Sequence, residues 1–407
     1  MKRSLWLVAG AAVLAVVIFY FGARAVGGRA ETVIALGAAI SQSGKYAREG
    51  KFYVDAYKMT VEAVNAAGGV KVGGQAHKLG LTLYDDQSDP SLAARLCTKL
   101  LTSDKVNFLL GPYTSGITIA ASAVAEKYEV PMIEGGGAAG NIFDHGYKYI
   151  FGTLSNAELY FQPAIEMAAK SEPPVKTAAL LFSNEAFDKS VAKGARKWLD
   201  EHKIERIYDE EYQPATLDFT SVLAVIKSKN PDLILLAGHE ENSLNFIRQS
   251  QAADVNPKMA VFTVGPPTGD FRKTLGAAAE YVYGITTWLP EMDHKDEIFE
   301  SSSNFAKQFH DRFAYEPDYH VASGAADVLA FKHAIEKADT LDPKKVRDAL
   351  ASLDVQTIYG RLRFNPTGQI ELPQTLVQIQ SGKVVPIYAG GKPLNKPRYP
   401  TPSWGAR

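Results

Sequence analysis

VNFLLGPYTSG (106–116) and VPMIEGGGAAG (130–140) each place an apolar run directly before a turn of glycine and small residues. The first run leads through Tyr113-Thr114-Ser115-Gly116 into an alanine-rich segment at 117–128, which the second run then follows. A strand, a turn, a helix and a second strand in this order predict a βα unit of a parallel sheet.

The same alternation extends outward from this stretch in both directions. Amphipathic segments such as 48–66, which stops at Gly68-Gly69, separate the apolar runs. One group of predicted strands covers 32–40, 78–86, 106–112 and 130–135, and a second covers 177–183, 204–212, 232–238 and 260–266. Two such groups predict an α/β protein with two doubly wound parallel-sheet lobes.

The C-terminal third is less regular. We expect 284–290 to carry the chain between the lobes, a helix near 320–337 and a hairpin over 359–372 with a Pro-Thr-Gly turn. The last fifteen residues contain four prolines and are expected to form an irregular tail.

Composition limits the partners and the compartment. Lysine plus arginine (44) nearly balances aspartate plus glutamate (45), which gives no electrostatic reason to expect nucleic acid as a partner. Cys97 is the single cysteine, so no intrachain disulfide is possible, and its helical spacing with leucines predicts a core position. Residues 1–30, with Lys2, Arg3 and an apolar run over 5–21, predict a signal peptide or a retained N-terminal anchor.

Ligands of open parallel sheets sit at the carboxyl ends of the strands, so the residues after each predicted strand are candidates for binding. Ser115 at a helix N-terminus could hold an anion, or it could only cap its own helix. The glycine run at 135–140 could admit a ligand to the backbone, or it could be a tight turn. The candidates at strand ends are Ser41, Ser43, Tyr46, Tyr113, Ser115, Gly136, Gly137, Ala138, Phe187, His239 and Pro267.

Motifs for catalysis or metal binding are not evident in the sequence. The run at 135–140 matches G-x-G-x-x-G, but the next strand-like segment starts at Tyr147 and leaves too few residues for a crossover helix. The histidines are scattered, and the acidic residues Asp85, Asp86 and Asp89 are expected in a strand-to-helix turn. We therefore expect no cofactor, no metal site and no enzyme.

Five segments carry a resemblance to a known family: SQSGKYAREG (41–50), LYDDQSDP (83–90), GPYTSG (111–116), VPMIEGGGAA (130–139) and YGRLRFNPTG (359–368). In their order and spacing the chain resembles type I periplasmic binding proteins of the branched-chain amino-acid group of ABC importers, over nearly all of 31–375. The resemblance implies three hinge crossovers, near 153–156, 286–290 and 373–376. Lobe 1 would then comprise 31–154 and 287–374, and lobe 2 would comprise 155–286 and 375–407.

The resemblance also implies roles for the candidate residues. Ser115, Gly136 and Ala138 would hold a ligand carboxylate. The second lobe would contribute Glu158 or its neighbour Tyr160, together with Phe187, His239 and Pro267. In amino-acid binders a threonine stands at Ala138, a tyrosine at His239, and a glutamate that pairs with the ligand ammonium at Pro267.

These departures bear on the ligand. Without an anionic partner, a buried ammonium would cost several kcal/mol. Unless Glu158 or Glu240 substitutes, the tyrosines and Phe187 favour an aromatic carboxylate or an amide over an amino acid.

The resulting prediction is a periplasmic, monomeric protein that closes two lobes on a small molecule and delivers it to an ABC-transporter membrane permease. One alternative is a membrane-anchored sensor of the same fold that signals through a partner, and another is an enzyme of the outer compartment.

Overall fold

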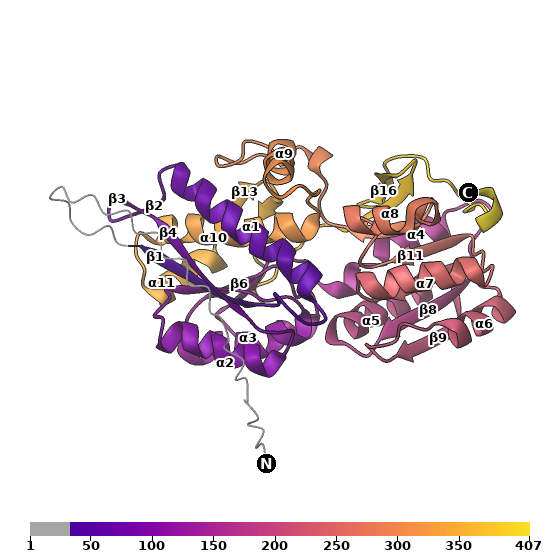
Figure 1. Ribbon diagram of the computed structural model, residues 1–407, viewed down its shortest axis with the longest axis horizontal. Helices are drawn as coiled ribbons and strands as arrows, with labels where there is room; N and C mark the ends of the chain where they lie inside the picture. The colour runs from indigo at the N-terminus through magenta and orange to yellow at the C-terminus, as the bar shows by residue number, and fades with distance from the viewer. Residues whose placement is uncertain (1–32) are drawn as a thin grey trace, which may run out of the picture.

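The computed structural model describes residues 33–407 as two lobes that lie side by side (Figure 1). Each lobe consists of one β-sheet with helices on both faces. The predicted signal peptide or anchor at 1–30 lies outside the described residues. The predicted class, α/β with two doubly wound lobes, is confirmed.

The sheet of the first lobe is parallel throughout and has five strands. Its order is β4 (Leu79–Asp85), β1 (Ile34–Ile40), β5 (Phe108–Leu110), β6 (Met132–Glu134) and β7 (Ile150–Gly152). The central strands β1, β5 and β6 are almost wholly buried, which explains why they read as apolar runs without alternation.

Two helix pairs cover the first sheet. On one face α1 (Ala47–Ala66) packs against α10 (Tyr319–Ala338), and on the other α2 (Pro90–Thr102) packs against α3 (Ser115–Tyr128). Further helices of this lobe are α9 (Ser302–Phe313) and α11 (Pro343–Ala351). Asp89 caps α2 as expected, by accepting a hydrogen bond from the backbone N–H of Leu92. Cys97 is buried in the core, as predicted.

The sheet of the second lobe is mixed. Its order is β17 (Lys392–Pro393), β16 (Lys383–Ala389), β15 (Thr375–Gln380), β12 (Tyr283–Thr286), β11 (Met259–Phe262), β10 (Leu233–Ala237), β8 (Thr177–Ser183) and β9 (Glu205–Tyr212). Strands β8 to β12 are parallel, and β15 to β17 extend the sheet antiparallel beyond β12. The sequence analysis did not assign these last three strands.

Helices α4 (Gln162–Ala169) and α5 (Ala186–Glu201) cover one face of the second sheet. The other face carries α6 (Thr220–Lys229), α7 (Glu240–Ala252) and α8 (Gly269–Leu275), whose aromatic residues Phe219, Phe246 and Phe271 build a separate core. Smaller elements include the hairpin of β2 (Val70–Val72) and β3 (Gln75–His77) and the 3-10 turn η2 (Ala157–Leu159).

The chain passes between the two sheets three times: after β7, after β12 and before β15. The first and third passages lie together, since Ser155 Oγ donates to the carbonyl of Leu372 at 2.7 Å and Gln369 donates to the carbonyl of Leu154. Trp288, on the second passage, donates to the carbonyl of Ile358. The lobe limits given above remain predictions.

The expected hairpin at 359–372 is present in part. β14 (Gly360–Leu362) pairs with β13 (Val355–Thr357), and Phe364 pairs with Ile370 across the Pro-Thr-Gly turn. Within residues 33–407, no helix combines the length and hydropathy that crossing a membrane requires.

Candidate ligand cleft

A small cavity of about 20 Å³ lies between the lobes, where the carboxyl ends of β5 and β6 face those of β8 and β10. This is room for about one water molecule, so a larger ligand requires the lobes or the lining side chains to move apart. It is lined by Tyr113, Thr114, Ser115, Gly136, Ala138, Leu154, Tyr160, Phe187, His239, Val264, Tyr319 and His320.

Ser115 provides a hydrogen-bond donor at one end of this cavity. Its Oγ accepts from the backbone N–H groups of Ala138 and Ala139, at 3.1 and 3.2 Å. A hydroxyl that accepts two bonds still has its own proton to donate. The N-cap residue of α3 is Thr114 and not Ser115, and no side chain forms a cap hydrogen bond there. Ser115 therefore does not cap its own helix. The hydroxyl and the N-terminus of α3 together suit an anionic group.

The glycine run is held from below by Glu134. Its Oε2 accepts from the N–H groups of Gly136 and Gly137, at 3.0 and 2.5 Å. A Cβ on Gly136 would lie 2.4 Å from the carbonyl oxygen of Pro112, so a side chain has no room there. Burial raises the pKa of Glu134 well above its ordinary value. Two N–H groups of the glycine run already donate to Glu134, so they are not offered to a ligand. The run instead leaves space for a ligand because it lacks side chains.

Aromatic side chains form the cavity walls. Tyr160 and Phe187 meet edge to face with ring centroids 5.1 Å apart, and Phe187 lies 6.0 Å from His239. On the first lobe, His320 lies 5.6 Å from the ring of Tyr113. Walls of this kind favour a flat or apolar ligand body.

The sequence analysis missed several cavity residues: Leu154, Val264, Tyr319 and His320, besides Thr114. Tyr319 and His320 open α10, whose N-cap Asp318 accepts from the backbone N–H of His320 at 2.9 Å. Asp318 directly before an apolar periodic segment is a recognisable helix start. That signal marks where the helix begins, but it does not indicate that the first turn of the helix reaches the cavity.

Polar contacts join the two lobes around the cavity. Tyr113 Oη lies 2.9 Å from His239 Nδ1, and Arg48 pairs with Glu240 at 2.6 Å. Glu185 of the second lobe accepts from Lys45 at 2.8 Å and from the hydroxyl of Tyr46. The two lobes are therefore in direct contact in this structure.

The pKa values of two of these groups are displaced in opposite directions. Burial alone would raise the pKa of Glu185, but the nearby imidazole of His239 and hydrogen bonds from Lys45 and Tyr46 hold that pKa well below its usual range. Burial alone would lower the pKa of His239, yet Glu185 and Asp188 raise it above its ordinary value.

Some predicted site residues lie outside the cavity lining. Ser41 donates to Asp86 and Ser43 to Asp85, so both hydroxyls fix the loop after β1. Gly137 bonds to Glu134, and Tyr46 bonds to Glu185 at the contact between the lobes. Pro267 is buried, and its carbonyl accepts from Arg272.

The two carboxylates suggested as partners for a ligand ammonium are both engaged. Glu158 pairs with Lys193 at 2.6 Å on the surface of the second lobe. Glu240 pairs with Arg48 and also accepts from the hydroxyl of Thr268. Neither carboxylate belongs to the cavity lining.

Residues 33–383 match the family described as "Periplasmic binding protein". The chain belongs to this family. The match spans both sheets, and the resemblance stated from the sequence is confirmed.

Proteins similar to this periplasmic binding protein are named for, or were solved with, different ligands. It is 25% identical over 386 residues to the Leu/Ile/Val-binding protein homolog 7 of Brucella abortus, covering 90% of this chain and 94% of that one. The substrate-binding protein LivJ of Streptococcus pneumoniae, solved with isoleucine, superimposes with a TM-score of 0.77 at 23% identity, covering 87% and 98%. A solute-binding protein of R. palustris, solved with benzoate, also gives 0.77, at 20% identity, covering 90% and 99%. These two structures establish the fold.

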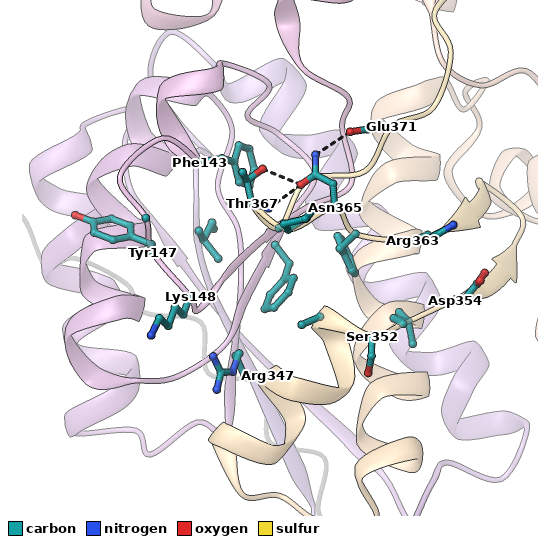
Figure 2. Close-up of a pocket in the computed structure, with 18 of the residues that line it drawn as sticks. Phe143, Tyr147, Lys148, Arg347, Ser352, Asp354, Arg363, Asn365, Thr367 and Glu371 are labelled. Carbon is teal, nitrogen blue, oxygen red and sulfur yellow. Dashed lines mark hydrogen bonds between the residues drawn. The ribbon is translucent and has the colours of Figure 1, made fainter.

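The periplasmic binding protein has a larger hollow on its first lobe, an open groove shown in Figure 2. Lys148, which precedes β7, lies on one side and Arg363 on the other, while Asn365 donates to Glu371 at 3.1 Å. The groove is open to solvent, and charged side chains are among the residues that line it. Two of its lining residues, Gly146 and Lys148, lie before β7, at the amino end of that strand. The enclosed cavity at the carboxyl ends of the strands is the better candidate for a ligand site.

Proposed function

We propose that this chain is the solute-binding protein of an ABC importer and that it captures a small carboxylate with an aromatic or otherwise flat apolar body. The observation that carries the proposal is the cavity between the lobes, which has Ser115 and the N-terminus of α3 at one end and aromatic walls around it. A carboxylate would accept from the Ser115 hydroxyl, and the ring would contact Tyr160 and Phe187.

The charges around the cavity favour such a ligand over an amino acid. No carboxylate side chain is among the residues that line the cavity, and Glu158 and Glu240 are both paired elsewhere. Pro267 has no charge to offer. An ammonium in this cavity would have no anionic partner among the lining residues, whereas a neutral ring would lose nothing on desolvation.

Capture proceeds by closure of the lobes. The ligand enters between separated lobes, and the contacts of Tyr113 with His239 and of Arg48 with Glu240 form as the lobes meet. A membrane permease then recognises the closed form, so the protein acts outside the cytoplasmic membrane after export through its N-terminal segment. The ligand is bound and released without chemical change.

A thermal-shift screen followed by calorimetry tests the proposal, with benzoate, benzamide and leucine as probes. We expect benzoate to raise the melting temperature and to bind at one site per chain, because a ligand that binds only the native state stabilises it. Benzamide separates the contribution of the carboxylate charge from that of the ring. Stabilisation by leucine but not by benzoate would contradict the assignment of ligand class.

A further inference from the structure

Three side chains of the second lobe converge beside the cavity: Glu185, Asp188 and His239. Glu185 precedes α5, Asp188 lies in its first turn, and His239 is the N-cap of α7. One ligand atom from each lies within 4.8 Å of the others. Asp188 is fully buried and His239 is 5% exposed.

In each of these three side chains, one nitrogen or oxygen atom forms a hydrogen bond and a second nitrogen or oxygen atom has no hydrogen-bond partner. His239 Nδ1 contacts Tyr113 at 2.9 Å, Glu185 Oε1 accepts from Lys45, and Asp188 Oδ2 accepts from Ser183. The atoms left over are His239 Nε2, Glu185 Oε2 and Asp188 Oδ1, all buried. Nε2 and Oε2 lie 3.2 Å apart without forming a hydrogen bond of suitable geometry. Outer contacts that orient a ring and two carboxylates toward one point are the arrangement that supports a metal ion.

We propose that Glu185, Asp188 and His239 bind one divalent cation of the zinc class. One imidazole nitrogen with two carboxylate oxygens is a donor set that suits Zn²⁺, whereas Ca²⁺ and Mg²⁺ prefer oxygen alone. Ligand atoms about 2.0–2.2 Å from a tetrahedral ion lie roughly 3.3–3.6 Å from one another, close to the separation of Nε2 and Oε2. Three protein ligands leave a fourth position for water.

A bound cation would also balance the negative charge of the two carboxylates in this part of the second lobe. The buried Asp188 and the partly buried Glu185 lie here beside the imidazole of His239, and Lys45 contacts Glu185 from the first lobe. When the lobes separate, that ammonium leaves, and the carboxylates need another positive charge. A bound cation supplies it within one lobe, independently of the ligand proposed above.

A second cluster also combines one imidazole with two carboxylates, but it is more exposed and a lysine contacts both of its carboxylates. Glu297, His333 and Glu336 also bring their ligand atoms within 4.8 Å. Lys332 lies between the two carboxylates, contacting Glu297 and lying 2.9 Å from Glu336. Because an ammonium already neutralises these carboxylates, this cluster should not bind a cation and serves as the matched control.

Isothermal titration of the purified protein with Zn²⁺ alone, in a buffer that does not chelate metals, tests the proposal. We expect one ion per chain, with affinity at least tenfold lower in Asp188→Asn and in His239→Gln. The control variants Glu297→Gln and His333→Gln should bind as the parent does. Absence of 1:1 binding, or loss of binding in His333→Gln but not in His239→Gln, would overturn the proposal.

A spectroscopic measurement on the unsubstituted protein keeps the proposal testable if a variant fails to fold. With ¹⁵N-labelled histidine, Zn²⁺ should shift the Nε2 resonance of one buried imidazole and abolish its response to pH. If that imidazole instead titrates in the same way with and without Zn²⁺, the group between Nε2 and Oε2 is a proton, and the metal site is refuted.

Discussion

The phenol oxygen of Tyr113 lies 2.9 Å from Nδ1 of His239, and this contact joins the turn after β5 of one lobe to the start of α7 of the other. Both side chains also line the cavity. A pair that bridges the lobes and touches the ligand site makes closure and binding sensitive to the same groups.

Ser115→Ala should weaken benzoate binding by roughly 10- to 150-fold, since a hydrogen bond to a charged group contributes about 1.5–3 kcal/mol. Calorimetry measures this directly. Ser122→Ala is the matched control, because Ser122 lies in the same helix and its hydroxyl donates to the carbonyl of Ile119. Equal affinities in both variants would refute the anion site at α3.

Arg48→Ala should weaken ligand binding several-fold by destabilising the closed arrangement. The side chain of Glu240 is 1% exposed and that of its partner Arg48 is 42% exposed, so the substitution leaves a buried carboxylate without its cation. Fluorescence energy transfer between dyes on the two lobes should report a smaller closed fraction at equal ligand saturation. Arg361→Ala removes an arginine that pairs with Asp354 in the first lobe, and this variant should close normally.

Gly194→Ala should reduce both stability and binding. A Cβ at this position would lie 2.0 Å from the carbonyl oxygen of Glu158, so α5 would have to move away from η2. Overpacking of this kind costs typically about 1–3 kcal/mol. Tyr160 follows η2 and lines the cavity, so affinity should fall together with the midpoint of urea unfolding. Gly146→Ala is the control, since nothing lies within 4 Å of the added Cβ, although its positive φ carries a small strain.

Asp327→Asn should flatten the dependence of stability on pH. Burial raises the pKa of Asp327 to about 8, although Thr153 and Tyr57 donate hydrogen bonds to it. An unfolded aspartate has a pKa of about 4, so the folded state retains a proton that the unfolded state loses. The free energy of unfolding should therefore fall as pH rises from about 4 to about 8, and less so in the variant. Urea unfolding across this range measures it, and parallel curves for both proteins would contradict the buried proton.

Local patterns predicted β1, β4, β5, β6 and β8 to β11, because most of these strands are short apolar runs bounded by glycine or polar residues. Strands β15 and β16 were missed because their place in the sheet comes from pairing with β12, far away in the sequence. Such pairing leaves little local trace.

The residues of the cavity, like the strands, were predicted from the sequence only in part. Tyr113, Ser115 and His239 follow strands whose carboxyl ends meet, so strand-end reasoning found them. Tyr319 and His320 were missed because they reach the cavity from α10, through the packing of that helix on α1. The cluster of Glu185, Asp188 and His239 was missed because α5 and α7 bring its members together and no local spacing records it.

The position of α10 also orders events during synthesis. All five strands of the first sheet are complete by residue 152, yet α10, which covers one face of that sheet, begins only at Tyr319. Until then that face is covered by α1 but not over β6, which α10 contacts, and the second lobe still lacks β15 to β17. Neither lobe can therefore finish folding until most of the chain has been synthesised.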